Sequence, residues 1–348
     1  MKDKLLDCLK RAIKDRVFPG AVLGISHRGQ RTILHAGRYT YDTNSPAVAF
    51  DTVYDLASVT KSVATSAVIL KLINESRISL EDKVSTHLPE FNDDPFKKEV
   101  TIWHLLTYTI ELDLPSIKTF LKLTPDDILA KLFSARLVSL EKKYHYTNQT
   151  AIILGEVAKR VTGKPLNVLA EDFFYRPLGM ASTSFYTKDI SHVAPTEIDP
   201  ETGKVLQGVV HDEGTRALAE KYITGAAGLF GNVPDLLTFM EMLLANGDYK
   251  DRKYFSHNLV NEMHTNQLGH INESAGLGWE MGREWMGATG SASAFGKSGF
   301  TGTSVYADPE KDLAIVLLSN RVYPKRPENS EAINKIRREV IEIILTEV

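Results

Sequence analysis

Both ends of this chain carry β-hairpin patterns, and a long helical pattern separates them. Near the N-terminus, strand-like runs at 21–27 and 31–38 flank the turn R-G-Q. Near the C-terminus, the runs T-S-V-Y-A-D-P and L-A-I-V-L-L-S-N flank the turn E-K-D. The pattern over about 60–245 is mostly helical. The simplest fold joins both hairpins in one antiparallel sheet, so the helical middle is an insertion.

Amphipathic helices are predicted at both termini. Apolar residues fall at helical spacing in each segment: Leu5, Leu6, Leu9 and Ile13 in the first, and Ile333, Ile336, Val340, Ile343 and Ile344 in the last. We therefore expect an α+β fold in which terminal helices flank the sheet. Residues 1–348 would form a single domain, with an α/β lobe at about 1–60 and 246–348 and a helical lobe at about 61–245.

The segment D-L-A-S-V-T-K places Ser58 and Lys61 three residues apart at a predicted helix start. Residues at that spacing share a helix face, so the lysine amine can reach the serine hydroxyl. A serine hydroxyl needs a neighbouring base to act as a nucleophile, and a lysine serves only if its pKa is lowered. Taken alone, the pattern fits a capping serine beside an exposed lysine equally well.

Two further fragments follow in chain order. Tyr146 and Asn148 form Y-x-N, and Lys297, Ser298 and Gly299 form K-x-G within G-K-S-G-F-T-G-T. The order S-x-x-K, Y-x-N, K-x-G resembles that of the class C β-lactamases and the related penicillin-binding proteins, serine esterases and D,D-peptidases. Other stretches resemble this family too, among them L-L-T, R-P-L-G-M and G-L-G-W, between about residues 18 and 321.

The resemblance implies an active site in a cleft between the two lobes. Ser58 would be the nucleophile, and Lys61 or an ionised Tyr146 the base; the sequence leaves this choice open because the two lysines and the tyrosine titrate as a group. Asn148 would orient Lys61 and a substrate carbonyl. The remaining site residues would bind the substrate: Lys297, Ser298, Gly299 and Phe300. The backbone N–H groups of Ser58 and Phe300 would form the oxyanion hole.

The chain departs from the family pattern at three places. Where many relatives have H-T-S-G after L-L-T, this chain has Y-T-I-E at 108–111, and where many have G-H-A-G-L-F it has G-A-A-G-L-F at 225–230. These two changes put the local shape of the pocket in doubt. Many esterase-like relatives have histidine at the position of Lys297, and the lysine favours recognition of a substrate carboxylate.

Composition excludes several other functions. The 348 residues are 43% hydrophobic and 24% charged with a net charge of −3, which gives no basic footprint for nucleic acid. The single cysteine, Cys8, excludes an internal disulfide, and the ten histidines show no metal-ligand spacing. We expect no metal and no organic cofactor. The charged N-terminus is not a signal peptide and no apolar stretch reaches 18 residues, so we expect a cytoplasmic protein that does not enter a membrane.

We therefore expect a serine hydrolase that cleaves an ester or amide bond through an acyl-enzyme on Ser58. The expected substrates are small-molecule esters or amides first, and β-lactams or D-amino-acid peptides second. An alternative from another class is a penicillin-binding or peptide-sensing module with the same fold but without turnover. The polar loops near 187–220 and 264–275 either border the cleft or are plain surface loops.

Overall fold

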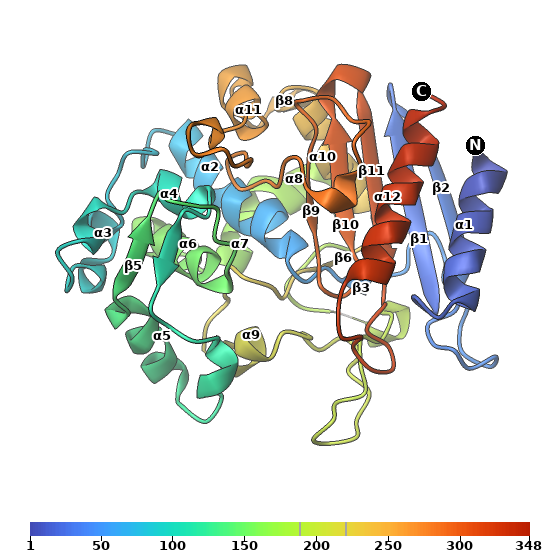
Figure 1. Cartoon of the computed structure of the whole chain (residues 1–348), viewed down its shortest axis with the longest axis horizontal. Helices are drawn as coiled ribbons and strands as arrows, with labels where there is room; N and C mark the ends of the chain where they lie inside the picture. Colours follow the sequence, from blue (N-terminus) through green and yellow to red (C-terminus); the bar gives the residue numbers. More distant parts are fainter. Residues whose placement is uncertain (188, 220) are drawn as a thin grey trace.

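A five-stranded antiparallel sheet in the order β2-β1-β11-β10-β9 forms one side of the molecule (Figure 1). The computed structural model describes residues 1–187, 189–219 and 221–348. The strands of the sheet are β1 (Gly20–His27), β2 (Gln30–Gly37), β9 (Phe295–Ser298), β10 (Ser304–Asp308) and β11 (Leu313–Ser319). The N-terminal and C-terminal hairpins meet where β1 pairs with β11, with Leu23 opposite Leu317. The predicted sheet built from both chain ends is therefore confirmed.

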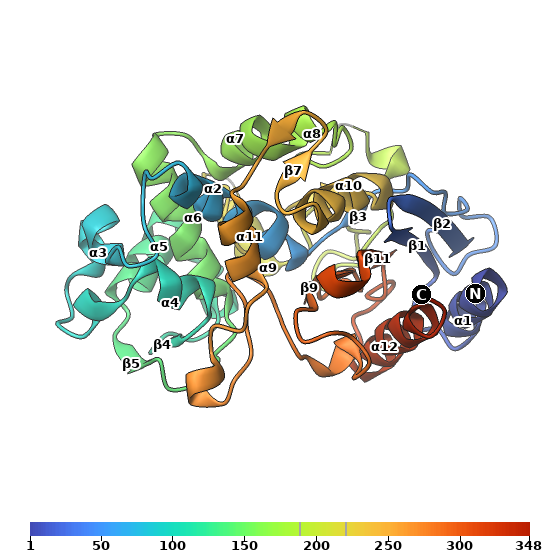
Figure 2. The ribbon, with the colours of Figure 1, turned by 90° about the horizontal axis from the view of Figure 1, so that it is seen from above.

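The strands β1, β10 and β11 are buried on both faces of the sheet, and side chains along each strand alternate between the two faces. Leu23 and Leu317 belong to the core beneath the terminal helices α1 (Lys2–Lys14) and α12 (Glu331–Leu345). Their neighbours Val22 and Leu318 belong to the larger core on the other face. Figure 2 shows α1 and α12 together on one side of β1 and β2.

Helix α10 (Val233–Leu244) covers the other face of the sheet, where it contacts β1, β10 and β11. The close approach depends on Gly24, where an added Cβ would lie 2.2 Å from Val233 Cγ1. This segment was expected in the helical lobe, whereas α10 packs against the sheet. Its helical periodicity was recognisable, but periodicity does not reveal which layer a helix packs against.

The second lobe contains most of the remaining helices and lies beside the sheet (Figures 1 and 2). The helices outside the sheet layers are α2 (Ala67–Asn74), α3 (Val84–His87), α4 (Ile102–Leu106), α5 (Pro125–Ser134), α6 (Asn148–Thr162), α7 (Leu166–Ala170), α8 (Arg176–Leu178), α9 (Glu213–Leu218) and α11 (His257–Met263). Short strand pairs complete the fold: β3 (Tyr54–Asp55) with β6 (Phe230–Gly231), β4 (Ile110–Leu112) with β5 (Leu137–Leu140), and β7 (Asp248–Tyr249) with β8 (Arg252–Lys253).

The helix that follows Ser58 runs through the boundary between the lobes. It opens with a π-helical stretch at Lys61–Ser66, in which every residue is buried, and continues as α2. Widened turns of this kind are frequent at functional sites. The predicted helix start is present, with Ser58 directly before the helix and Lys61 in its first turn.

Replacing Gly24 with alanine should lower the free energy of unfolding by about 1–3 kcal/mol, because the new Cβ overpacks the contact between β1 and α10. Gly269→Ala is the matched control, since its Cβ would meet nothing closer than Asn266 Nδ2 at 3.7 Å. Chemical denaturation of both variants measures the difference. Equal stabilities would show that α10 does not depend on this close approach.

Candidate active site

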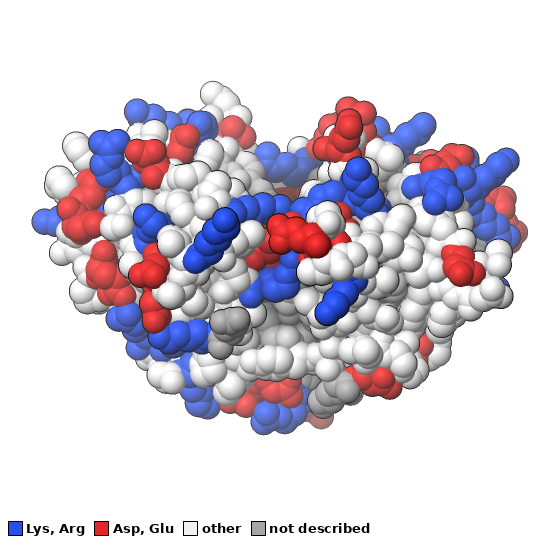
Figure 3. Space-filling model, turned by 90° about the horizontal axis from the view of Figure 1, so that it is seen from below, with Lys and Arg blue, Asp and Glu red and all other residues white. Residues whose placement is uncertain are grey.

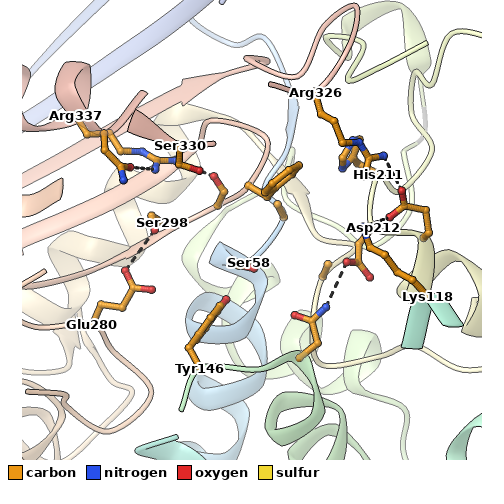
Figure 4. Close-up of a pocket in the computed structure, with 17 residues that line it drawn as sticks. Ser58, Lys118, Tyr146, His211, Asp212, Glu280, Ser298, Arg326, Ser330 and Arg337 are labelled. Carbon is orange, nitrogen blue, oxygen red and sulfur yellow. Dashed lines mark hydrogen bonds and ion pairs between the residues drawn. The ribbon is translucent and has the colours of Figure 1, made fainter. Parts of the chain in front are cut away.

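One pocket of about 360 Å³ brings together residues from all three sequence motifs (Figure 4). The predicted residues that line it are Ser58, Tyr146, Asn148, Ser298, Gly299 and Phe300. Lys61 and Lys297 lie directly behind this lining, and both are fully buried. The fold therefore brings residues from the helix after β3, the start of α6 and the edge strand β9 to one place.

Lys61 is held against Ser58 by two short contacts. Its Nζ donates to Ser58 Oγ at 3.0 Å and to the carbonyl oxygen of Ala226 at 2.7 Å. Burial first, and then the nearby charge of Lys297, lower the pKa of Lys61 to about 7. Ala226 belongs to the departure at 225–230, so this stretch still supplies a backbone acceptor for the lysine.

The residue before Ser58 has a strained backbone. Ala57 has a φ of 47°, which residues with a Cβ rarely adopt. The buried carboxylate of Asp55 fixes this turn, because its Oδ1 accepts from the Ala57 N–H at 2.8 Å while its Oδ2 accepts from the His211 N–H at 2.8 Å. One buried side chain thus ties the nucleophile turn to the loop that forms the opposite wall.

Tyr146 presents its ring to both lysines. Lys297 Nζ lies 4.1 Å and Lys61 Nζ 5.4 Å from the ring centroid. The side chain is 40% exposed to the cleft, yet its surroundings raise the pKa of Tyr146 well above its ordinary value, first through desolvation and then through the negative charge of Glu280. Tyr146 could act as the base only if ionised, and these surroundings disfavour the ionised form.

Lys297 has an internal partner that the sequence did not reveal. Its Nζ forms an ion pair with Glu280 Oε1 at 2.9 Å, although this contact does not have the geometry of a hydrogen bond. Glu280 also accepts from Trp285 Nε1 at 2.9 Å, and Lys297 lowers the pKa of the Glu280 carboxyl. We expected Lys297 to recognise a substrate carboxylate, but a protein carboxylate already neutralises it.

Asn148 also has a partner other than the predicted one. Its side-chain amide donates to Asp212 Oδ2 at 3.3 Å, whereas the second contact of Lys61 is with the Ala226 carbonyl. Asn148 begins α6, and Asp212 caps the N-terminus of α9. Neither Asp212 nor Glu280 was singled out from the sequence, because each lies in a stretch with no catalytic spacing.

The turn after β9 is fastened to the segment before Ser58. Thr303 Oγ1 donates to the Leu56 carbonyl at 2.9 Å, and the buried Arg337 donates to the Gly299 carbonyl at 2.7 Å. The ring of Phe300 is 44% exposed and stacks on His211 with a centroid separation of 5.7 Å. These contacts hold the Phe300 backbone close to the nucleophile turn.

The loop at 187–220, of which residues 188 and 220 lie outside the described structure, supplies part of the pocket wall through 211–213. Glu213 pairs with Lys118 at 2.9 Å and with Arg326 at 2.6 Å. Residues 264–275 are not among those that line the pocket. Figure 3 shows acidic and basic side chains next to one another in the middle of the lower face.

The described part of the chain contains neither a membrane-spanning helix nor a group of side chains arranged to bind a metal ion. Within it, no helix has the length and apolar character needed to cross a bilayer. In the same residues, no group of three or more His, Cys, Asp or Glu side chains is arranged to hold a metal ion.

The fold is mixed α+β, and a serine contacts a buried lysine at the boundary between the lobes. These features define a class of serine hydrolases in which lysine takes the place of histidine as the base. Comparison with known proteins agrees with this class. The family model described as Beta-lactamase matches residues 5–338. The chain belongs to the beta-lactamase family, and the predicted family, fold class and hydrolase activity are confirmed.

Relatives and solved structures illustrate the range of this family. A putative D-alanyl-D-alanine carboxypeptidase of Escherichia coli (strain K12) is 30% identical over 303 residues, which are 78% of this chain and 69% of the relative. An N-acetylmuramyl-L-alanine amidase of Bacillus subtilis (strain 168) is 28% identical over 87% of this chain and 77% of its own length. The structure of EstCE1, a hydrolase with promiscuous acyltransferase activity, has a TM-score of 0.80 at 21% identity and covers 98% of both chains.

Replacing Glu280 with glutamine should lower the free energy of unfolding by about 3–5 kcal/mol, because it leaves the buried ammonium of Lys297 without its partner charge. Glu284→Gln is the control: Glu284 is 82% exposed and pairs with Arg338 at 3.0 Å, so its loss should cost less than about 1 kcal/mol. Denaturant titration at pH 7 compares the two. Similar losses in both variants would contradict a structural role for the buried pair.

Proposed function

We propose that Ser58 is the nucleophile and Lys61 the base of a hydrolase that works through an acyl-enzyme. Neutral Lys61 takes the Ser58 proton as the serine oxygen attacks the substrate carbonyl carbon. The N–H groups of Ser58 and Phe300 donate to the oxyanion. The leaving group departs with the proton that Lys61 accepted. Water then attacks the acyl-enzyme by the same route, which releases the carboxylic acid and restores the Ser58 hydroxyl.

The observation that carries this proposal is the 3.0 Å contact between Lys61 Nζ and Ser58 Oγ, combined with a pKa of Lys61 lowered to about 7. A general base works best when its pKa lies near the working pH. Tyr146 meets this requirement less well, because its pKa is raised rather than lowered. We assign Tyr146 to a second position in the site, where its hydroxyl can relay a proton to the leaving group.

The proposed substrates are small-molecule esters and amides, followed by β-lactams and D-amino-acid peptides. Support comes from the relatives, which include a putative D-alanyl-D-alanine carboxypeptidase and an N-acetylmuramyl-L-alanine amidase, and from a fold shared with a hydrolase that has promiscuous acyltransferase activity. The pairing of Lys297 with Glu280 weakens the argument for an obligatory substrate carboxylate. Nothing in the site favours the alternative of a binding module, which would not need a lysine of lowered pKa beside its serine.

Replacing Ser58 with alanine should reduce hydrolysis of p-nitrophenyl esters at least about 10³-fold, since the nucleophile and its partners act as a unit. Wild-type protein incubated with a fluorescent penicillin should gain the mass of a covalent acyl adduct, and the variant should not. Ser134→Ala, an exposed serine on α5, serves as the control. The assignment would be overturned if the Ser58→Ala variant still formed the adduct or still hydrolysed the ester. It would also be overturned if the wild type showed neither an adduct nor turnover with every ester and amide tried.

A further inference from the structure

The carboxylates that line the pocket differ in how their charges are balanced. Three line it: Asp212, Glu213 and Glu280. Glu213 pairs with Lys118 and Arg326, and Glu280 pairs with Lys297. Among the described residues, no cationic side chain lies within 4.0 Å of the Asp212 carboxylate. Asp212 thus carries a negative charge into the cleft that no protein cation in this set neutralises.

Asp212 is held firmly on both sides. The preceding residue, His211, is anchored through its backbone N–H to Asp55 and through its ring to Glu197 at 2.8 Å. The following residue, Glu213, is fixed by its two ion pairs. Figure 4 shows Asp212 on the side of Ser58 away from Glu280 and Ser298. The carboxylate is therefore preorganised at one end of the cleft.

Capping of α9 does not explain the charge of Asp212. Its Oδ1 accepts from the Thr215 N–H at 2.7 Å, but asparagine caps a helix as well as aspartate does. The other contact, from the Asn148 amide, is long at 3.3 Å. An ionised carboxylate offers about four acceptor sites, so capacity remains for a ligand.

The charge of Asp212 also acts on Lys61. Asp212 raises the pKa of Lys61, which opposes the lowering that burial and Lys297 provide. A neutral residue such as asparagine would cap α9 without this effect on Lys61. The carboxylate is therefore available for a task that capping does not require, the binding of a cation.

We propose that Asp212 binds the free ammonium group of the substrate's acyl portion, so that the preferred substrates are aminoacyl esters, aminoacyl amides and short peptides with an unblocked amine. This inference rests on the proposed acylation of Ser58. In an aminoacyl derivative or a peptide, the free amine lies on the acyl side of the scissile bond. An ammonium group offers three donors, and a charge-assisted hydrogen bond to carboxylate is about twice as strong as a neutral one.

The surroundings of Asp212 leave space for such a group. Asp212 and Asn148 line both the pocket that contains Ser58 and a neighbouring cavity of about 280 Å³, which Leu112 and Ile117 also line. An amine held at Asp212 therefore lies between the reacting carbonyl and a second space of mixed polarity. That space can accept the side chain of the aminoacyl group.

The test compares alanyl p-nitroanilides with a free amine, in D and L forms, with their N-acetyl counterparts. The wild type should show a kcat/KM at least about tenfold higher for the free amine in one of the two stereochemical series. Asp212→Asn should bring that ratio to about one, and Asp212→Ser, which also retains a capping side chain, should do the same. Any change in the reactivity of Lys61 cancels in the ratio, because the same base serves both substrates.

Asp189→Asn provides the matched control, since Asp189 caps a 3₁₀ helix through the Ser191 N–H away from the Ser58 pocket; its ratio should equal that of the wild type. A wild-type ratio near one, or a preference unchanged in both Asp212 variants, would overturn the ammonium site while leaving the acylation of Ser58 intact. Activity that is insensitive to Ser58→Ala would instead overturn the proposed function. The two failures are therefore distinguishable.

Discussion

The burial of Lys61 is the interaction on which the site depends. A lysine enclosed by protein favours its neutral form, and the Ser58 hydroxyl and the Ala226 carbonyl are the hydrogen-bonding groups it contacts. Because the pKa of this lysine falls from 10.5 to about 7 on folding, the unfolded chain binds the proton more tightly. The free energy of unfolding should therefore carry a penalty on the order of 5 kcal/mol below about pH 7, which is relieved as the pH rises toward the unfolded pKa. The rest of the fold must supply enough stability to keep this lysine enclosed.

The two lobes contribute different parts of the cleft. The sheet side supplies the edge strand β9 with its buried Lys297–Glu280 pair, and the other wall supplies Asn148, Asp212 and Glu213. Asp55 connects the two walls, because one carboxylate accepts from the turn before Ser58 and from the loop before Asp212. A displacement of either wall would therefore disturb the nucleophile turn. This coupling explains how short loops with little regular structure can hold a reactive geometry.

Much of this arrangement could be predicted from the sequence. The strand-like runs and their turns at both chain ends predicted the sheet, and the spacing of Ser58 and Lys61 predicted their contact, because both are local patterns. The layer to which α10 belongs could not be predicted, since its apolar periodicity fits packing against either lobe. Glu280 and Asp212 were missed for a different reason: their partners, Lys297 and Asn148, are distant in sequence and meet only in the folded chain. The binding of a substrate carboxylate by Lys297 stays a prediction, and its buried partner Glu280 could not be foreseen from the sequence.

The most direct test of the central claim, that Lys61 is the base for Ser58, is the pH dependence of kcat/KM for an ester whose own groups do not titrate. This profile reports the essential groups of the free enzyme. Activity should fall about tenfold per pH unit below an apparent pKa near 7 and level off above it, because only neutral Lys61 accepts the Ser58 proton. An activity that stays flat through pH 7 and rises only toward pH 10 and beyond would contradict the account and assign the base to the Tyr146 phenolate instead.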